Sequence, residues 1–220
     1  MAPFQKLALH AIGSLKNVIL LAPTGAGKMV VAYLSIFVLQ KKFGVPDGVG
    51  LGTQPLSSIM NEKVKNSYMK TGTISMHGEL TANIDFEDDE EEDDDLNLSA
   101  SVDEFKSGQI NCLIGHAESW VTKTACDILD CLQEKGKIIF SFLDEAHIPL
   151  KGHWDSFRPL LKLVPGQLRV RTLRGAPCLA MTATLTPLEI EELKNSLGLR
   201  ASNTVVLQAN PIQRHHKYIR

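Results

Sequence analysis

Short apolar runs rich in β-branched residues alternate along this chain with longer amphipathic stretches of helical period. The first such pair is Asn17 to Leu21 followed by Lys28 to Lys42, which ends at Gly44 as helices commonly do. This alternation predicts an α/β fold in which a mostly parallel sheet carries helices on both faces. The further strands expected are 48–52, 73–77, 110–115, 137–143, 177–182 and 204–208, with helices after Pro55, at about 118–133 and at 187–197.

A chain of 220 residues is long enough for one domain with its own core. We expect that domain to cover residues 1–209, with a tail at 210–220. A nearly continuous acidic run from Asp85 to Asp95 interrupts the pattern and has few apolar groups to bury. Residues 85–97 are therefore expected to be a disordered insertion, either a solvated spacer or a segment that mimics nucleic acid.

The formal charge of −2 gives no global basic signature, although the acidic run conceals a basic remainder. The four cysteines, Cys112, Cys126, Cys131 and Cys178, include no C-x-x-C pair, so we expect reduced thiols in an intracellular protein. The start of the chain lacks a signal-like apolar core, and the longest apolar stretch, Met29 to Leu39, is far shorter than a membrane span. Neither secretion nor membrane insertion is expected.

The loops after Leu21, Leu143 and Met181 are the candidate sites, because ligands of open parallel sheets lie beyond the carboxyl ends of the strands. The first loop follows an apolar strand, opens a helix and reads Ala22-Pro23-Thr24-Gly25-Ala26-Gly27-Lys28-Met29. Its glycines let backbone amides face a phosphate, and Lys28 can reach the β- and γ-phosphates of a triphosphate. A simple turn between strand and helix is the alternative.

Two positions of this loop depart from the G-x-x-x-x-G-K-[ST] pattern. Ala22 replaces the first glycine, and Met29 replaces the hydroxyl residue that normally contacts magnesium. A thioether is a weak ligand for this hard cation, so Mg²⁺ would depend on phosphate, water and nearby acidic residues. The loop is compatible with ATP binding even where hydrolysis is slow or absent.

The second loop delivers Asp144-Glu145-Ala146-His147 from a buried strand to the same edge of the sheet. Phosphoryl transfer to water needs a carboxylate that holds magnesium, which suits Asp144, and a group that positions the water, which suits Glu145. His147 is then placed to link the nucleotide to neighbouring loops. Two acids that complement a helix dipole are the alternative, disfavoured by the phosphate loop and by Thr182-Ala183-Thr184 at a later strand end.

Taken in order, Gln5, Ala22 to Lys28, Asp144 to His147 and Thr182 to Thr184 resemble the motifs of the first motor lobe of superfamily-two helicases, and within that group the RecQ family. The resemblance implies a RecA-like P-loop domain with ATP and Mg²⁺ as cofactors. It implies that Gln5 reads the adenine, that Asp144 holds the metal, and that Thr182 and Thr184 couple the sites. An ordinary surface glutamine is the alternative for Gln5.

Two further segments resemble nucleic-acid-binding parts of the RecQ family. Thr53 to Met60 is similar to an S-P-L-x-S-L-M stretch, which implies that Pro55 and Ser57 face the nucleic-acid backbone; a capped amphipathic helix satisfies the same residues. Gly152 to Pro159 resembles the family's aromatic-rich loop, which implies base stacking and phosphate contacts by Trp154, Phe157 and Arg158. Trp154 follows Gly-His instead of preceding it, so a packing role is its alternative.

The resemblance implies an ATP-dependent 3′-to-5′ DNA helicase that acts on single-stranded or forked DNA in repair and recombination, within the nucleus. Residues 210–220 would be the connector toward a second RecA-like lobe, present in cis or in trans, that supplies an arginine to the transition state. Without that lobe the chain should not unwind DNA. The alternatives are a non-catalytic nucleotide- or nucleic-acid-binding module and the lobe of an RNA helicase.

Overall fold

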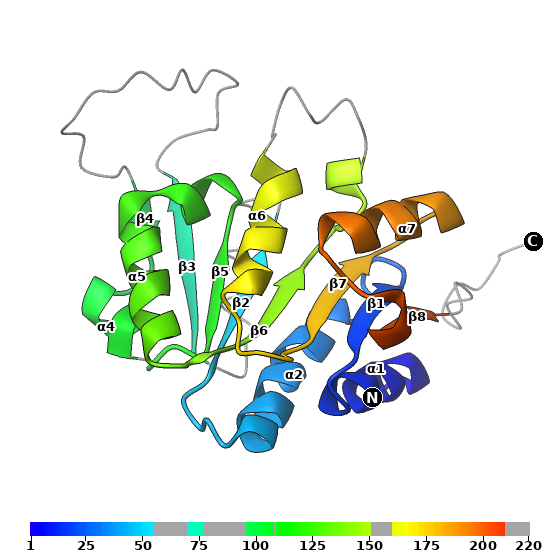
Figure 1. The fold of residues 1–220 in the computed structure, drawn as a ribbon, viewed down its shortest axis with the longest axis horizontal. Helices are drawn as coiled ribbons and strands as arrows, with labels where there is room; N and C mark the ends of the chain where they lie inside the picture. The colour runs from blue at the N-terminus through cyan, green and yellow to red at the C-terminus, as the bar shows by residue number, and fades with distance from the viewer. Residues whose placement is uncertain (55–69, 77–95, 108, 151–159, 210–220) are drawn as a thin grey trace, which may run out of the picture.

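The structure, a computed structural model, describes residues 1–54, 70–76, 96–107, 109–150 and 160–209 (Figure 1). The helix predicted after Pro55, the acidic run Asp85 to Asp95, the aromatic-rich loop and the predicted connector lie outside these residues. The last two positions of the predicted insertion, 96 and 97, fall within a described strand.

Eight strands form one sheet in the order β4-β3-β5-β2-β6-β7-β1-β8. All neighbouring pairs are parallel except β3 and β4, which confirms the predicted α/β fold with a mostly parallel sheet. The strands are β1 (Asn17–Leu21), β2 (Val49–Thr53), β3 (Thr71–Met76), β4 (Leu96–Leu98), β5 (Cys112–Gly115), β6 (Ile138–Leu143), β7 (Cys178–Thr182) and β8 (Thr204–Gln208).

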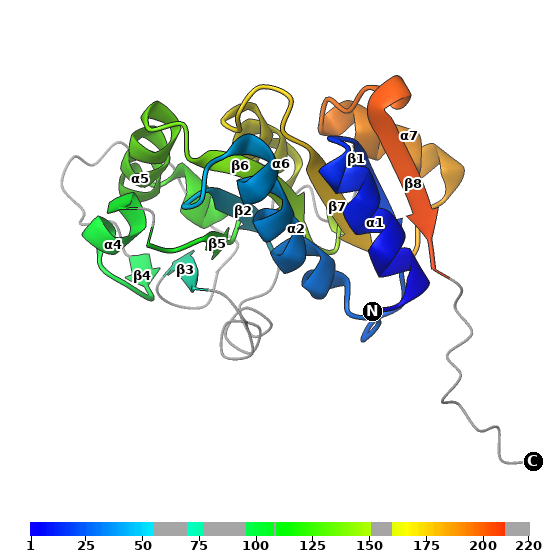
Figure 2. The same ribbon diagram turned by 90° about the horizontal axis from the view of Figure 1, so that it is seen from below.

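Helices cover both faces of the sheet, as Figures 1 and 2 show. On one face lie α1 (Pro3–Gly13) and α2 (Lys28–Phe43), and on the other lie α5 (Lys123–Glu134), α6 (Leu160–Val170) and α7 (Pro187–Ser196), with the short α4 (Val102–Ser107) packed beside α5. The 3-10 turns are η1 (Glu118–Val121), η2 (Ile148–Leu150) and η4 (Ala201–Asn203).

Strand β1 shows why both faces need cover. Successive side chains of a strand point to opposite faces, so Val18 and Leu20 join the core beneath α1 and α2 while Ile19 and Leu21 join the core beneath α7. All four are buried, and burial of each such side chain stabilises the fold by about 1.5–3 kcal/mol. A strand that is apolar throughout is what a parallel sheet with two covered faces requires.

Four elements were not expected from the sequence: α1, β4, α4 and α6. Helix α6 contains Pro165 followed by glycine, a pair that normally interrupts helices. It forms because Leu161, Val164 and Leu168 are buried in one core cluster with β2 and α5, and this packing offsets the lost backbone hydrogen bond.

The helix predicted at about 118–133 is two elements, because Thr122 is extended and its Oγ1 accepts a hydrogen bond from the Ala125 amide. The turn η1 therefore ends at Val121, and α5 begins at Lys123. All four cysteines are free, with Cys112 and Cys178 buried. Among the described residues no helix is long and apolar enough to cross a membrane.

A close contact between β2 and β6 gives a first test of the fold. Gly52 pairs with Phe142 across these strands, and a Cβ at position 52 would lie 2.2 Å from the Phe142 ring. Gly52→Ala should therefore destabilise the protein by about 1–3 kcal/mol in urea denaturation, since the ring has to move from a packed core. Phe142→Leu makes room for the methyl group, so the double variant should lose less stability than the sum of the two single variants.

Candidate functional site

Three adjacent strands, β6, β7 and β1, bring the predicted loops to one edge of the sheet. Backbone hydrogen bonds join these loops beyond the strand ends: Ala22 N donates to Thr182 O at 2.9 Å, and Ala146 N donates to Met181 O at 2.9 Å. The expectation that the segments after Leu21, Leu143 and Met181 meet is confirmed. The first loop lies more than 100 residues before the other two in the sequence, so the sheet order brings it to them.

The first loop is a tight curl between β1 and α2. Gly25 and Gly27 have φ of 77° and 81°, a left-handed conformation that residues with a Cβ rarely adopt. Lys28 begins α2 and is only 7% exposed. Its ammonium group turns back onto the loop and donates to the carbonyl oxygens of Ala22 at 3.0 Å and Pro23 at 3.3 Å. A cation and a helix N-terminus thus converge on the inside of the loop, where an anion is favoured.

Gln5 on α1 packs against this loop. Its Nε2 donates to Gly27 O at 3.1 Å and to Ala26 O at 3.5 Å, and its Oε1 accepts from Ala2 N at 2.8 Å. The side chain is 7% exposed, so Gln5 is not the ordinary surface glutamine that we kept as an alternative. A Cβ at position 27 would lie 2.8 Å from the Gln5 amide, and the glycine there is what lets α1 approach so closely. The adenine-reading role of Gln5 stays a prediction.

The second loop follows β6 and places both acids beside the first. Asp144 is buried, and Glu145 has φ of 51°, a left-handed conformation that is uncommon outside glycine and is concentrated at functional sites. The residues that follow form the short turn η2, and no α-helix of the described residues begins at these acids. The dipole-complementing alternative for this segment is therefore not supported.

The two loops enclose one cavity of about 280 Å³, which we call the loop cavity. It is lined by Thr24, Gly25, Gly27, Lys28, Met29, Asp144 and Glu145. A cation, two curled glycines and two carboxylates share this space, although they come from segments far apart in the sequence. That combination suits the tail of a triphosphate with its metal, because the lysine neutralises phosphate charge and a carboxylate can hold a divalent cation.

His147 joins the second loop to the end of β7. Its Nδ1 lies 2.8 Å from Thr182 Oγ1, in a hydrogen bond, and 3.3 Å from Glu145 Oε2. Thr182 is fully buried and the His147 side chain is 25% exposed, so this bond is shielded from water on the Thr182 side. Thr184 is exposed, and no hydrogen bond among the described residues joins it to this network. The structure thus brings Thr182, but not Thr184, into contact with the predicted catalytic residues.

Gln54, directly after β2, is a site residue to which the sequence gave no role. It is 1% exposed, and its Nε2 donates to Asp144 Oδ2 at 3.4 Å and to Met29 Sδ at 3.7 Å. The amide therefore lies between the carboxylate and the thioether that replaces the usual hydroxyl. No local pattern could have found it, because the contact depends on β2 being the neighbour of β6.

These surroundings accommodate the triphosphate better than they accommodate magnesium. Asp144 and Glu145 are the loop-cavity residues that offer a charged oxygen to a metal. Met29 offers sulfur, and Gln54 points its NH₂ group at both Met29 and Asp144. No cluster of three His, Cys, Asp or Glu side chains that could hold a metal occurs in the part of the chain that the structure describes. Mg²⁺ at this place would rest on Asp144, phosphate oxygens and water.

The electrostatics of α2 also reflect this site. Burial raises the pKa of the Tyr33 phenol above its ordinary value, and the neighbouring Cys112 and Asp144 raise it further. The predicted nucleic-acid residues Pro55, Ser57, Trp154, Phe157 and Arg158 lie outside the described residues, and their roles stay predictions.

The chain was compared with known protein families. The sequence model of the DEAD/DEAH box helicase family matches residues 2–193, which is most of the chain. The chain belongs to this family. Its Asp144-Glu145-Ala146-His147 segment spells the DEAH form of the motif. The protein is thus a superfamily-two helicase lobe of RecA-like fold, and domains of this family bind ATP, generally with Mg²⁺.

Solved structures share the fold of this DEAD/DEAH box lobe at low sequence identity. The Hef helicase domain of Pyrococcus furiosus has a TM-score of 0.54 and 15% identity over 93% of this chain and 37% of its own. A hypothetical ATP-dependent RNA helicase of Sulfolobus tokodaii has a TM-score of 0.56 and 14% identity, and the match covers 94% of this chain and 52% of its own. The DUF1998 helicase MrfA bound to DNA has a TM-score of 0.65 and 12% identity, and the match covers 96% of this chain and 27% of its own.

The chain therefore spans between about a quarter and a half of the length of these helicases. A comparison with curated protein sequences gives no match. At 12–15% identity the similar structures establish the fold and do not distinguish a DNA helicase from an RNA helicase.

The bond between His147 and Thr182 can be tested by a double-mutant cycle. His147→Ala and Thr182→Val each remove one partner, and the double variant removes both. Because the bond is buried at Thr182, the coupling energy in urea denaturation should be about 0.5–1.5 kcal/mol. The same cycle between His147→Ala and Thr184→Val serves as the control, and its coupling should be near zero. Equal coupling in both cycles would show that the bond is not specific.

Proposed function

We propose that this DEAD/DEAH box lobe is the ATP-binding motor lobe of a RecQ-like 3′-to-5′ DNA helicase. The observation that carries the ATP-binding part is the loop cavity, where Lys28 and both acids line one space of about 280 Å³. The family model supports an ATPase of the helicase type. The RecQ-like part rests on the resemblance of Gly152 to Pro159 to the aromatic-rich loop of that family.

Each site residue has a task in this proposal. The amides of the curled loop and the Lys28 ammonium bind the phosphates, after the ammonium exchanges its bonds to Ala22 and Pro23 for bonds to phosphate oxygens. Asp144 holds Mg²⁺, which neutralises the charge of the phosphates. Glu145 orients the attacking water. His147 contacts both Glu145 and Thr182, and it thereby couples this acid to the end of β7.

The proposed helicase also needs a second lobe, a connector to it and a DNA substrate. Similar helicases are two to four times as long as the part this chain spans, which supports a second RecA-like lobe as the partner, in cis or in trans. Residues 210–220 are its proposed connector, and single-stranded or forked DNA in the nucleus is the proposed substrate. The isolated lobe should bind ATP without unwinding DNA, because no facing arginine closes the cavity.

A non-catalytic nucleotide-binding module is the second candidate, and one contact favours it. Met29 occupies the magnesium-facing position, and the Gln54 amide bonds both its sulfur and the Asp144 carboxylate. A lobe built this way could bind ATP as a sensor while the metal stays too weakly held for hydrolysis.

Calorimetric titration of the chain with ATP, with and without magnesium, separates these candidates. For a motor lobe we expect magnesium to tighten ATP binding, and we expect Lys28→Ala to weaken it at least about tenfold, because a charge-assisted contact to phosphate is lost. Lys41→Ala, an exposed lysine in the last turn of the same helix, is the matched control and should leave the affinity unchanged.

The Met29→Ser variant makes the outcome decisive. An ATP affinity that is independent of magnesium in the unsubstituted chain but depends on magnesium in Met29→Ser would support the sensor and contradict the motor lobe. An ATP affinity that Lys28→Ala does not change would contradict both candidates, since each places the phosphates on this lysine.

The preference for DNA can be measured separately by fluorescence anisotropy with labelled single-stranded DNA and RNA of the same length. We expect tighter binding of DNA, and a loss of affinity in Phe157→Ala and Arg158→Gln because stacking and a phosphate contact are removed. The Arg158 variant should also reduce the dependence on salt. Equal or tighter binding of RNA would favour the lobe of an RNA helicase instead.

A further inference from the structure

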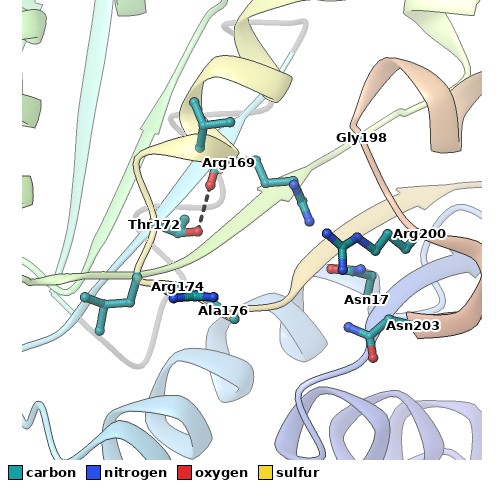
Figure 3. A pocket seen from close by; sticks show the side chains of 11 residues that line it. Asn17, Arg169, Thr172, Arg174, Ala176, Gly198, Arg200 and Asn203 are labelled. Carbon is teal, nitrogen blue, oxygen red and sulfur yellow. Dashed lines mark hydrogen bonds between the residues drawn. The ribbon is translucent and has the colours of Figure 1, made fainter.

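A second and larger cavity lies at the amino ends of the strands, opposite the carboxyl ends where the loop cavity lies. Its volume is about 500 Å³, and it opens at Asn17, the first residue of β1, whereas the loop cavity lies beyond the carboxyl end of the same strand. We call it the arginine pocket; Figure 3 shows the residues that line it, among them Asn17, Arg169, Arg174, Arg200 and Asn203.

Three arginines line this pocket, and no acidic residue does. Within the described parts of the chain, Arg169, Arg174 and Arg200 form no ion pair. Arg171, two residues after Arg169 and outside the pocket, pairs with Asp130. Arginines that gather without carboxylates repel one another in the absence of a counter-ion. An anion bound among them would remove this repulsion.

Buried polar groups in the pocket are also left for a ligand. The Nε atom of Arg169 is buried and has no hydrogen-bond partner among the described residues. Asn17 is 3% exposed, and its Oδ1 accepts from Cys178 N at 3.0 Å, which leaves its NH₂ group to donate. In Figure 3 the heads of Arg169 and Arg200 and the amides of Asn17 and Asn203 lie together on one side of the pocket.

We propose that the arginine pocket is a second anion site, which binds a multiply charged phosphate group carried by a nucleotide-like small molecule or by a nucleic-acid strand. Guanidinium groups match phosphate oxygens in paired hydrogen bonds, and the Asn17 amide adds a neutral donor. The volume exceeds that of a single phosphate and falls in the range of ligand pockets, so it accommodates a polyphosphate or a phosphate with its attached group.

Inorganic tripolyphosphate is the first probe, titrated calorimetrically into the Lys28→Ala chain, in which binding at the phosphate loop is weakened. We expect one remaining site, weakened about tenfold by Arg200→Gln and abolished by the charge reversal Arg200→Glu. Arg200 is exposed, so its substitution should leave the fold intact, which circular dichroism verifies. Arg171→Gln is the matched control and should change the affinity by less than about twofold, because this arginine lies outside the pocket.

A labelled single-stranded oligonucleotide is the second probe and identifies the source of the phosphate. If the Lys28→Ala chain binds tripolyphosphate in an Arg200-dependent way, a small phosphorylated ligand is the source. If it binds the oligonucleotide alone, and Arg200→Gln weakens that binding, the strand is the source. If Arg200→Gln and Arg171→Gln behave alike with both probes, or neither probe binds, the proposal is overturned. The ATP titrations above do not affect this outcome, since they concern the other edge of the sheet.

Discussion

The parallel pairing of β6, β7 and β1 is the constraint on which the site depends. In this register Leu143 lies opposite Ala180 and Leu21 lies opposite Thr182, so β7 extends two residues beyond the end of β6. The chain leaving β6 therefore runs alongside the last residues of β7, where Ala146 N meets Met181 O and His147 meets Thr182. A shift of this register would separate the acids from the phosphate loop, since no side chain could span the change.

The parts of this arrangement that local sequence determines were predictable. Strands β1 and β8 have the expected bounds, and α2 ends at Phe43, followed by Gly44 in the left-handed conformation expected of a helix cap. Helix α6 was missed because Pro165 opposes it locally, and tertiary packing of its apolar side decides the outcome. The bond from Gln54 to Asp144 was missed for a different reason: it depends on the order of strands in the sheet, and a single sequence does not carry that order.

The positions of the cationic groups in this protein are more informative about phosphate binding than its net charge. A net charge of −2 suggests no affinity for phosphate, yet cationic groups gather at both edges of the sheet, Lys28 at one and three arginines at the other. Four of the 23 lysines and arginines lie in these two cavities. The two edges differ in kind: one surrounds its cation with curled backbone and acids, and the other has guanidinium groups without acids.

The position of the Lys28 ammonium has a consequence for affinity. This ammonium group donates hydrogen bonds to the carbonyl oxygens of Ala22 and Pro23, and Gln5 donates to the carbonyl oxygen of Gly27. An incoming phosphate competes with the loop's own oxygens, so the measured affinity is a difference between two sets of hydrogen bonds to the same cation. These internal hydrogen bonds stabilise the shape of the loop, and the same bonds limit how tightly it can hold a nucleotide. The hydrogen bonds that order this loop before a nucleotide binds thus also reduce its affinity for the nucleotide.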